Sequence, residues 1–458
     1  MTAWPADGHR FRRPLQVGHV GLAVPFAAAI VAARLPVRDN SYLWHVRAGT
    51  VQIDQTSVLT TDPFSFTAGG QPWRTQSWLA DLLYGWGDRL WGLDLVAPLV
   101  LVGAVLLVAT IAVRASGSVG TPLLAAWGTV WILWLTIGYF TPRPVLLSLS
   151  LLGLFLLAAD REKLRWALVP LMWIWASVHG GFVVGLGYLV LDGLRRRDRA
   201  RVWDTAGAGL VTLLTAHGWG VWETIFTFAR SGEALDLIVE WLPPDFTSVE
   251  HLPFGLGILA LLVGAMKGRI EPRDLWVVGP FLLFAFTANR AVPLASLVLA
   301  PFFLQSLVRM SSKGMPSKAT NVETRLNAVL LCAVLVIPVL VPLAGGLDRE
   351  LFAVEAITHL APGRAFHDDA VGGYLIYAEW PERQVYVDDR AELYGDAFVD
   401  FVRARAGNAE WREVFDRYQI RQALLKVEDP LAQILAVSGW QERFRDEKFV
   451  ILSEPDVA

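Results

Sequence analysis

Residues 37–49, VRDNSYLWHVRAG, place a single carboxylate, that of Asp39, directly after a long apolar run. The run covers residues 15–36 and is long enough to cross a bilayer, for which about 20 apolar residues are needed. It is also longer than the roughly 7–15 apolar residues of a secretory signal, so we expect a retained span rather than a cleaved signal. Asp39 is therefore predicted to lie at the mouth of this span, where a carboxylate can accept a proton between membrane and water. The alternative is a solvated residue at a helix end, paired with Arg38.

Outward from this stretch, the composition is that of a membrane protein. Hydrophobic residues make up 54% of the chain and charged residues only 18%, whereas soluble domains carry about 25% charged residues. Apolar runs recur as far as residue 347, after which the charged fraction rises. We therefore expect an α-helical polytopic membrane domain over residues 1–348 and an external α/β domain over residues 349–458.

Charge, cysteine content and motifs exclude several functions. The formal net charge is −3 and no basic patch is interleaved with aromatic residues in the soluble part, so nucleic acid is not an expected partner. Cys332 is the only cysteine, which excludes an internal disulfide and a cysteine metal site. The sequence also lacks a Gly-Lys-Ser phosphate loop, a Gly-x-Ser-x-Gly elbow and a His-Glu-x-x-His helix. A cytoplasmic nucleotide as donor or energy source is therefore unsupported.

Basic clusters fix the predicted orientation, because Lys and Arg accumulate in cytoplasmic loops. All basic clusters stay cytoplasmic if two spans separate each cluster from the next. This requires two short spans that meet at His179; the alternative there is one long tilted helix. The N-terminus is then cytoplasmic, whereas loops 37–92 and 218–251 and the C-terminal domain are external. The predicted spans, about eleven in number, cover residues 15–36, 93–113, 120–138, 144–159, 166–178, 180–193, 202–217, 252–266, 274–289, 291–308 and 326–346.

The first external loop contains an amphipathic segment, residues 75–93, TQSWLADLLYGWGDRLWGL. Helical spacing gathers its tryptophans and leucines on one stripe, opposite Asp81, Asp88 and Arg89. Tryptophan is favoured at the membrane surface, so we predict an interfacial helix. The alternative is a helix packed on the soluble tail.

Several polar residues of the first external loop are candidates for contacts to a substrate. His45 and Arg47 follow Asp39 closely. Asp62 lies in TTDPFSFTAGGQPW, on a turn set by Pro63, and its alternative role is to cap that turn. Arg74 follows the same segment.

The other candidates lie in segments predicted to converge on the same face. Arg143 stands between two prolines in YFTPRPVLLS, and its planar fork suits phosphate, although snorkelling to lipid headgroups is the alternative. His179 precedes two glycines in WASVHGGF and is either a ligand contact or a structural histidine. Glu240 lies beside a Pro-Pro unit in IVEWLPPDF, and Arg290 lies in the turn of FTANRAVPL, where an arginine commonly acts as an anchor.

The C-terminal tail has the pattern of a small α/β domain. Short alternating segments predict strands, and two intervening stretches, near 395–405 and 409–418, predict helices. Asp388, Asp389 and Arg390 stand at the end of one predicted strand, where an acidic loop is more often structural than functional. The predicted strand segments are GRAFHD (363–368), GGYLIYA (372–378), RQVYVDD (383–389), QALLKV (422–427) and KFVILSE (448–454).

These features together resemble the GT-C superfamily of integral-membrane glycosyltransferases. Within it, the chain looks like a poorly characterised bacterial group, on the segments DNSYLWHVRAG, TTDPFSF, TPRPVLLS, HGGF, IVEWLPPDF, GGYLIY and VDDRAELYG. The resemblance covers most of the chain. It implies a multi-pass protein of the bacterial plasma membrane that transfers a sugar from a polyprenyl-phosphate donor to an unknown envelope glycan, lipid or protein.

The resemblance also implies roles for individual residues. An acidic residue of the first external loop serves as catalytic base in the superfamily, and Asp39 matches that position; inversion at the anomeric carbon follows. The familiar pattern has two adjacent acidic residues, whereas Asn40 follows Asp39 here, which leaves a divalent metal possible but in doubt. Arg143, Arg290 and His179 would stabilise the leaving phosphate, with Arg74 a weaker candidate.

Three other functions remain open from the sequence. One is an enzyme like the O-antigen ligases or polymerases, which move glycan from undecaprenyl diphosphate; the early Asp39 loop and the large tail argue against it. Another is a lipid or solute transporter, for which paired repeats or midplane charges would be expected. The last is an inactive glycan-binding scaffold of the same fold.

Overall fold

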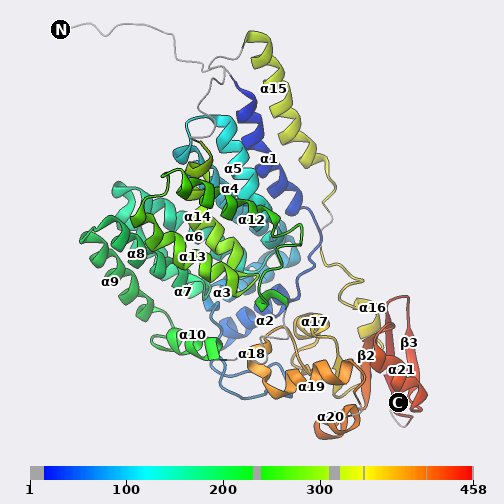
Figure 1. Cartoon of the computed structure of the whole chain (residues 1–458). Coiled ribbons are helices and arrows are strands. Elements are labelled where there is room, and N and C mark those ends of the chain that lie inside the picture. The colour runs from blue at the N-terminus through cyan, green and yellow to red at the C-terminus, as the bar shows by residue number, and fades with distance from the viewer. Residues whose placement is uncertain (1–14, 231–238, 309–319, 344–345, 409, 456–458) are drawn as a thin grey trace, which may run out of the picture.

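The chain forms a large helical part that carries one small sheet near its C-terminus. The computed structural model describes residues 15–230, 239–308, 320–343, 346–408 and 410–455. The basic clusters Arg10/Arg12/Arg13 and Arg309/Lys313/Lys318, used for the orientation, lie outside these residues. Figure 1 shows the helices of the first three quarters of the chain grouped together, with the strands beside their lower end.

The helical part contains α1–α10 and α12–α15. Their bounds are α1 Val17–Ala32, α2 Asn40–Gln55, α3 Trp78–Trp91, α4 Val96–Ser118, α5 Pro122–Thr136, α6 Pro144–Asp160, α7 Leu168–Val178, α8 Phe182–Arg196, α9 Ala200–Val211, α10 Gly220–Arg230, α12 Leu252–Met266, α13 Leu275–Thr287, α14 Ala291–Val308 and α15 Asn321–Val336. Helix α15 lies along α1 at the edge of the group (Figure 1).

A helix occupies each of the eleven predicted spans, but the helices differ in length. Three helical runs among the described residues are long and apolar enough to cross a membrane, namely Trp78–Ser118, Pro122–Tyr139 and Asn321–Leu340. Four further apolar helices are shorter, at Val17–Ala32, Pro144–Asp160, Leu252–Met266 and Ala291–Leu307. Since a full crossing needs about 20 residues, the number of about eleven spans stays a prediction.

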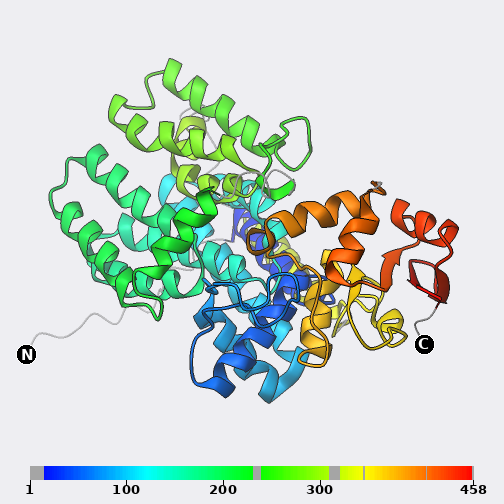
Figure 2. The same ribbon diagram turned by 90° about the horizontal axis from the view of Figure 1, so that it is seen from below.

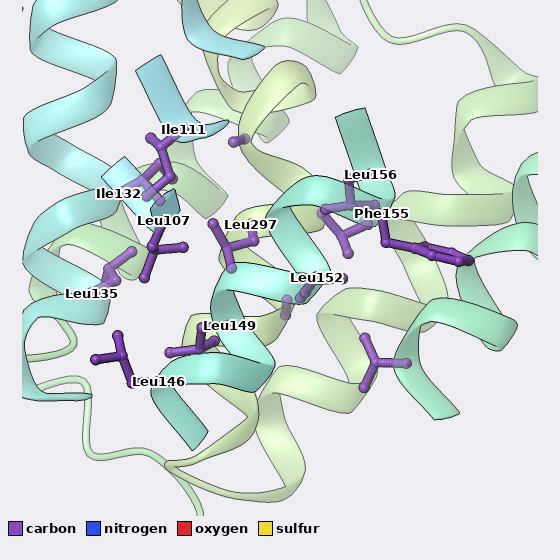
Figure 3. Close-up of a cluster of buried hydrophobic side chains, with 14 of the residues drawn as sticks. Leu107, Ile111, Ile132, Leu135, Leu146, Leu149, Leu152, Phe155, Leu156 and Leu297 are labelled. Carbon is purple, nitrogen blue, oxygen red and sulfur yellow. The ribbon is translucent and has the colours of Figure 1, made fainter. Parts of the chain in front are cut away.

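The core of the helical part is built from aliphatic side chains that α4, α5, α6 and α14 turn toward one another. Leu107 of α4, Ile132 of α5, Leu149 of α6 and Leu297 of α14 are at most 2% exposed and meet in one cluster (Figure 3). Between helices predicted to span a membrane, such side chains stabilise the packing mainly by van der Waals contact. The cluster fixes the end of α6 from which Arg143 projects.

The C-terminal part is a four-stranded sheet with short helices. The sheet order is β1-β2-β4-β3, with β1 parallel to β2 and the other two pairings antiparallel. The strands are β1 Ala365–His367, β2 Gln422–Lys426, β3 Gln441–Arg445 and β4 Phe449–Ser453. The helices are α16 Val354–Ile357, α17 Asp369–Glu379, α18 Ala391–Tyr394, α19 Asp396–Arg405, α20 Trp411–Tyr418 and α21 Pro430–Val437.

Two of the five predicted strands are wrong. GGYLIYA belongs to α17, which begins because the Asp368 carboxylate accepts a hydrogen bond from the Ala370 N–H at 3.0 Å and so caps the first turn. RQVYVDD stays outside the sheet; its Val385 forms an isolated parallel bridge with Ser65, in the loop that joins α2 to α3. Strand β3 was not predicted, because its mostly exposed, charged residues show no apolar alternation.

The loop between α2 and α3, residues 56–77, packs into the C-terminal part. Phe66 and Ala68 belong to the same apolar cluster as Phe366 and Tyr386, and Figure 2 shows the loop between α2 and α3 beside the C-terminal segments. Packing therefore crosses residue 348, and the division into 1–348 and 349–458 stays a prediction.

Helix α17 packs closely against α2 at Gly373. A Cβ added at Gly373 would overlap the backbone oxygen of Asn40, so Gly373→Ala is expected to force the two helices apart and to cost about 1–3 kcal/mol of stability. Thermal unfolding of the purified protein measures the loss. Gly187→Ala is the matched control, because nothing lies within 4 Å of its added Cβ and alanine is the better helix former. Equal melting of the Gly373 variant and wild type would contradict this packing.

Candidate functional site

The centre of the candidate site is Arg143, at the start of α6. The residue before a proline is pushed to an extended conformation, and Arg143 has φ −70° and ψ 151° with Pro144 as the first residue of the helix. Helix α6 therefore begins at Pro144 with the Arg143 side chain outside its first turn. This position follows from the TPRP sequence itself.

Three carboxylates from distant parts of the chain surround the Arg143 guanidinium. Its Nε lies 3.0 Å from Asp39 Oδ1, its Nη2 lies 3.0 Å from Asp389 Oδ2, and its Nη1 lies 3.2 Å from Glu240 Oε1. The side chains of Asp39, Asp389 and Glu240 are 10%, 18% and 42% exposed. Asp39 and Asp389 thus form the inner part of the cluster and Glu240 its open rim.

Asp39 is held at the N-terminus of α2. Its Oδ1 accepts a hydrogen bond from the Ser41 N–H at 3.1 Å and so caps the helix, a position where a carboxylate is favoured. Burial raises the pKa of the Asp39 carboxyl above 3.8; Arg143 opposes this shift, while the charge of Asp389 adds to it. Arg38, the alternative partner, instead pairs with Asp348 at 3.2 Å. Asp39 is thus a shielded carboxylate whose basicity depends on Arg143.

Asp389 also belongs to the candidate site, although the sequence favoured a structural role for it. Its Oδ1 accepts a hydrogen bond from the Trp44 indole N–H at 2.7 Å, and its Oδ2 accepts one from the Ser41 hydroxyl. The same hydroxyl accepts hydrogen bonds from Arg143 Nε and Nη2 at 2.9 and 2.5 Å. The C-terminal part therefore contributes a carboxylate to the same cluster as Asp39. In the sequence, the feature that pointed to this carboxylate was the segment VDDRAELYG, residues 387–395.

Arg290 approaches the same rim from the turn between α13 and α14. The turn is fixed against the segment Val239–Trp241, since the N–H of Arg290 donates to the Glu240 carbonyl at 3.1 Å. The Arg290 guanidinium lies over the Trp241 ring, 4.4 Å from its centre. Within the described residues it makes no ion pair. Arg290 is thus a half-buried cation that can take an anionic ligand.

His179 lies nearby, between α7 and α8. Its Nδ1 accepts a hydrogen bond from the Gly181 N–H at 2.9 Å, so the proton of the neutral ring is on Nε2. Burial, together with the charges of Arg290, His45 and Arg143, lowers the pKa of His179 from 6.5 to about 3. His179 is therefore neutral near pH 7, and its Nε2 can donate a hydrogen bond to a ligand.

Three predicted contact residues occupy other positions. His45 is 6% exposed, and its Nδ1 lies 2.5 Å from Oδ1 of the fully buried Asp81. Asp62 is 1% exposed and accepts hydrogen bonds from the backbone N–H groups of Phe64 and Ser65, which fits its alternative role as a turn cap. Arg74 pairs with Glu223 at 2.6 Å. None of the three makes a polar contact to Asp39 or Arg143.

The inner carboxylates do not fit a divalent metal. The described residues hold no group of three or more histidine, cysteine, aspartate or glutamate side chains suited to a metal ion. Asn40, which stands where a second acidic residue would be, donates its amide to the Asp369 carbonyl at 3.4 Å. Between Asp39 and Asp389, the positive charge that a metal ion would bring is supplied by Arg143.

Comparison with known proteins supports the fold. No family model matches the chain, and no curated protein is similar enough to count as a relative. Among solved structures, the apo crystal structure of the oligosaccharyltransferase of Archaeoglobus fulgidus is similar, with a TM-score of 0.51. The match covers 89% of this chain and 70% of the archaeal chain at 13% sequence identity. The likeness shows that the two chains share an overall fold.

Proposed function

We propose that this protein is a membrane glycosyltransferase that moves a sugar from a polyprenyl-phosphate-linked donor to an extracytoplasmic acceptor, with inversion at the anomeric carbon. The observation that carries the proposal is the shielded Asp39 carboxylate, 3.0 Å from Arg143, beside Arg290, which makes no ion pair to any residue that the structure describes. The fold shared with an oligosaccharyltransferase supports it. The protein would lie in the bacterial plasma membrane, with this site on the outer face.

Asp39 would act as the general base. Its carboxylate takes the proton of the acceptor hydroxyl while that oxygen forms a bond to the anomeric carbon. The bond from the anomeric carbon to the phosphate oxygen breaks on the opposite face, and its electron pair leaves with the polyprenyl phosphate. The raised pKa of Asp39 brings its basicity nearer to neutral pH, which favours proton transfer.

The leaving phosphate would bind at the cationic rim. Arg290 has no ion pair among the described residues, and an arginine can donate two hydrogen bonds to a phosphate at once. His179 Nε2 adds a neutral donor, and Arg143 can exchange the partly exposed Glu240 for a phosphate oxygen. The exposed apolar side chains of α3, including Leu83, Trp86, Leu90 and Trp91, would border the lipid chain of the donor, as expected of an interfacial helix.

Sugar transfer measured in membranes that contain the full chain tests the proposal. Radiolabelled polyprenyl-phosphate sugars are offered in one arm and an undecaprenyl-diphosphate oligosaccharide in the other. We expect label to enter envelope acceptors only in the first arm. Transfer only from the diphosphate donor would favour an enzyme like the O-antigen ligases. No transfer in either arm would favour a transporter or a glycan-binding scaffold.

The dependence of activity on pH gives a second test. A base works only when it is deprotonated, so kcat/KM should fall as the pH drops through the pKa of Asp39, which lies above 3.8. Arg143 lowers that pKa, and Arg143→Ala should therefore move the acid limb to higher pH, whatever it does to the maximal rate. The readout is the midpoint of the kcat/KM profile.

Arg89→Ala is the control for this profile, because Arg89 pairs with Asp54 at the far end of α2. Its acid limb should coincide with that of wild type. An acid limb that Arg143→Ala leaves unmoved would show that the titrating base is not next to Arg143.

A further inference from the structure

A polar cavity lies at the other end of α8 and α14, away from the candidate site. It has a volume of about 600 Å³ and is bounded by the C-terminal ends of α4, α8 and α14 and by the segment between α12 and α13. Helix α8 begins three residues after His179 and ends at Arg196. At 1.5 Å per residue, the cavity is thus about 20 Å from the Arg143 cluster. It is not part of the proposed catalytic site.

The lining of the cavity is predominantly cationic. Four arginines face two carboxylates: Arg195, Arg196, Arg269 and Arg273 against Glu271 and Asp274. This leaves an excess of two positive charges among the side chains that line it.

A buried carboxylate holds two of these arginines in place. The fully buried Asp192 carboxylate lies 2.8 Å from Arg195 and 2.9 Å from Arg196, and Arg195 also pairs with Asp274 at 3.1 Å. These contacts fix the two guanidiniums in the lining of the cavity. A cavity with positioned cations is suited to bind an anion without further ordering of side chains.

The other two arginines are available to a ligand. Arg269 donates a hydrogen bond to the Ser306 carbonyl at 2.6 Å and makes no ion pair within the described residues. Arg273 pairs only with Glu271 there, and both side chains are more than half exposed. An exposed pair of this kind contributes little, so Arg273 can turn toward a phosphate at small cost.

Residues within two positions of the lining residues in the sequence are exposed and apolar. Leu194 is 48% exposed, Met266 87%, Leu275 56% and Trp276 53%. A soluble anion would gain nothing from this apolar rim, whereas the acyl chains of a lipid would cover it. Basic pockets between membrane helices are suited to anionic headgroups. We propose that the cavity binds the phosphate of an anionic phospholipid, with Arg269 and Arg273 as its main contacts.

Lipid binding to the purified full chain in neutral detergent tests this site. The probes are phosphatidylglycerol, phosphatidylcholine with the same acyl chains, and water-soluble glycerol 3-phosphate, each followed by native mass spectrometry. Phosphatidylcholine carries the same phosphate but also a choline cation, which the excess of arginines repels, so we expect phosphatidylglycerol to bind about tenfold or more tightly. Arg269→Ala should weaken phosphatidylglycerol about tenfold, the loss of one charge-assisted hydrogen bond, and narrow the difference between the two lipids.

Arg199→Ala is the matched control, because Arg199 is exposed at the same end of α8 but does not line the cavity. Should Arg269→Ala not fold, Arg273→Ala replaces it, since within the described part of the chain that exposed side chain pairs only with Glu271. Equal binding of the two lipids, or equal weakening by Arg199→Ala, would overturn the proposal. Glycerol 3-phosphate that binds as tightly as phosphatidylglycerol would overturn it too, in favour of a soluble phosphate ligand.

Discussion

Asp39→Asn is expected to lower the rate of sugar transfer by about 10²–10⁴-fold, the usual contribution of a general base. Asparagine is nearly isosteric and is as good an N-cap as aspartate, so the bond from the Ser41 N–H that begins α2 is kept. The loss would then come from the missing base rather than from an unfolded helix. The measurement is transfer from the polyprenyl-phosphate sugar at saturating donor, in membranes with equal amounts of each variant.

Asp54→Asn is the matched control, because Asp54 is an exposed carboxylate on the same helix, paired with Arg89. It should transfer sugar at the wild-type rate. Asp389→Asn separates the two inner carboxylates, since Asp389 contacts Arg143 at 3.0 Å as Asp39 does. Full activity of Asp39→Asn together with an inactive Asp389→Asn would assign the base to the C-terminal part and refute the role of Asp39.

Arg390→Met is expected to destabilise the protein by about 3–5 kcal/mol, the cost of leaving a buried charge without its partner. Arg390 is 2% exposed and lies between Asp62 and Asp388, with its Nη1 2.8 Å from the first and its Nη2 2.6 Å from the second. Its guanidinium also lies over the Trp73 ring, 4.5 Å from the centre. Removing it leaves two carboxylates without their partner where residues 56–77 contact the C-terminal part.

Thermal unfolding and limited proteolysis of the C-terminal part measure this loss. Arg412→Met provides the control, because Arg412 is exposed and makes no ion pair among the described residues; its guanidinium forms a 3.4 Å hydrogen bond to Ser438 and lies 4.9 Å from the centre of the Trp411 ring. The double variant Asp62→Asn with Arg390→Met should lose less free energy of unfolding than the sum of the losses in the two single variants, since the two residues form one ion pair. Strict additivity would show that Asp62 and Arg390 are not coupled.

The sequence alone determined features that depend on neighbouring residues. The apolar runs placed a helix in each predicted span, and the TPRP motif placed Arg143 just before the first turn of α6. Asp39 was located at a helix end, although as the cap of α2 rather than as part of α1. Each of these follows from local hydropathy, proline geometry or capping, which act over a few residues.

Only the tertiary structure decided which polar side chains meet. Asp389 contacts Arg143 across 246 residues of sequence. Asp62 instead pairs with Arg390, across 328 residues. GGYLIYA alternates like a strand, yet it forms a helix that rests on α2 through Gly373. Whether a carboxylate is a base, a cap or half of a buried ion pair depends on its burial and on the charges around it. Both are set by the packing of segments far apart in the chain, so no local pattern carries them.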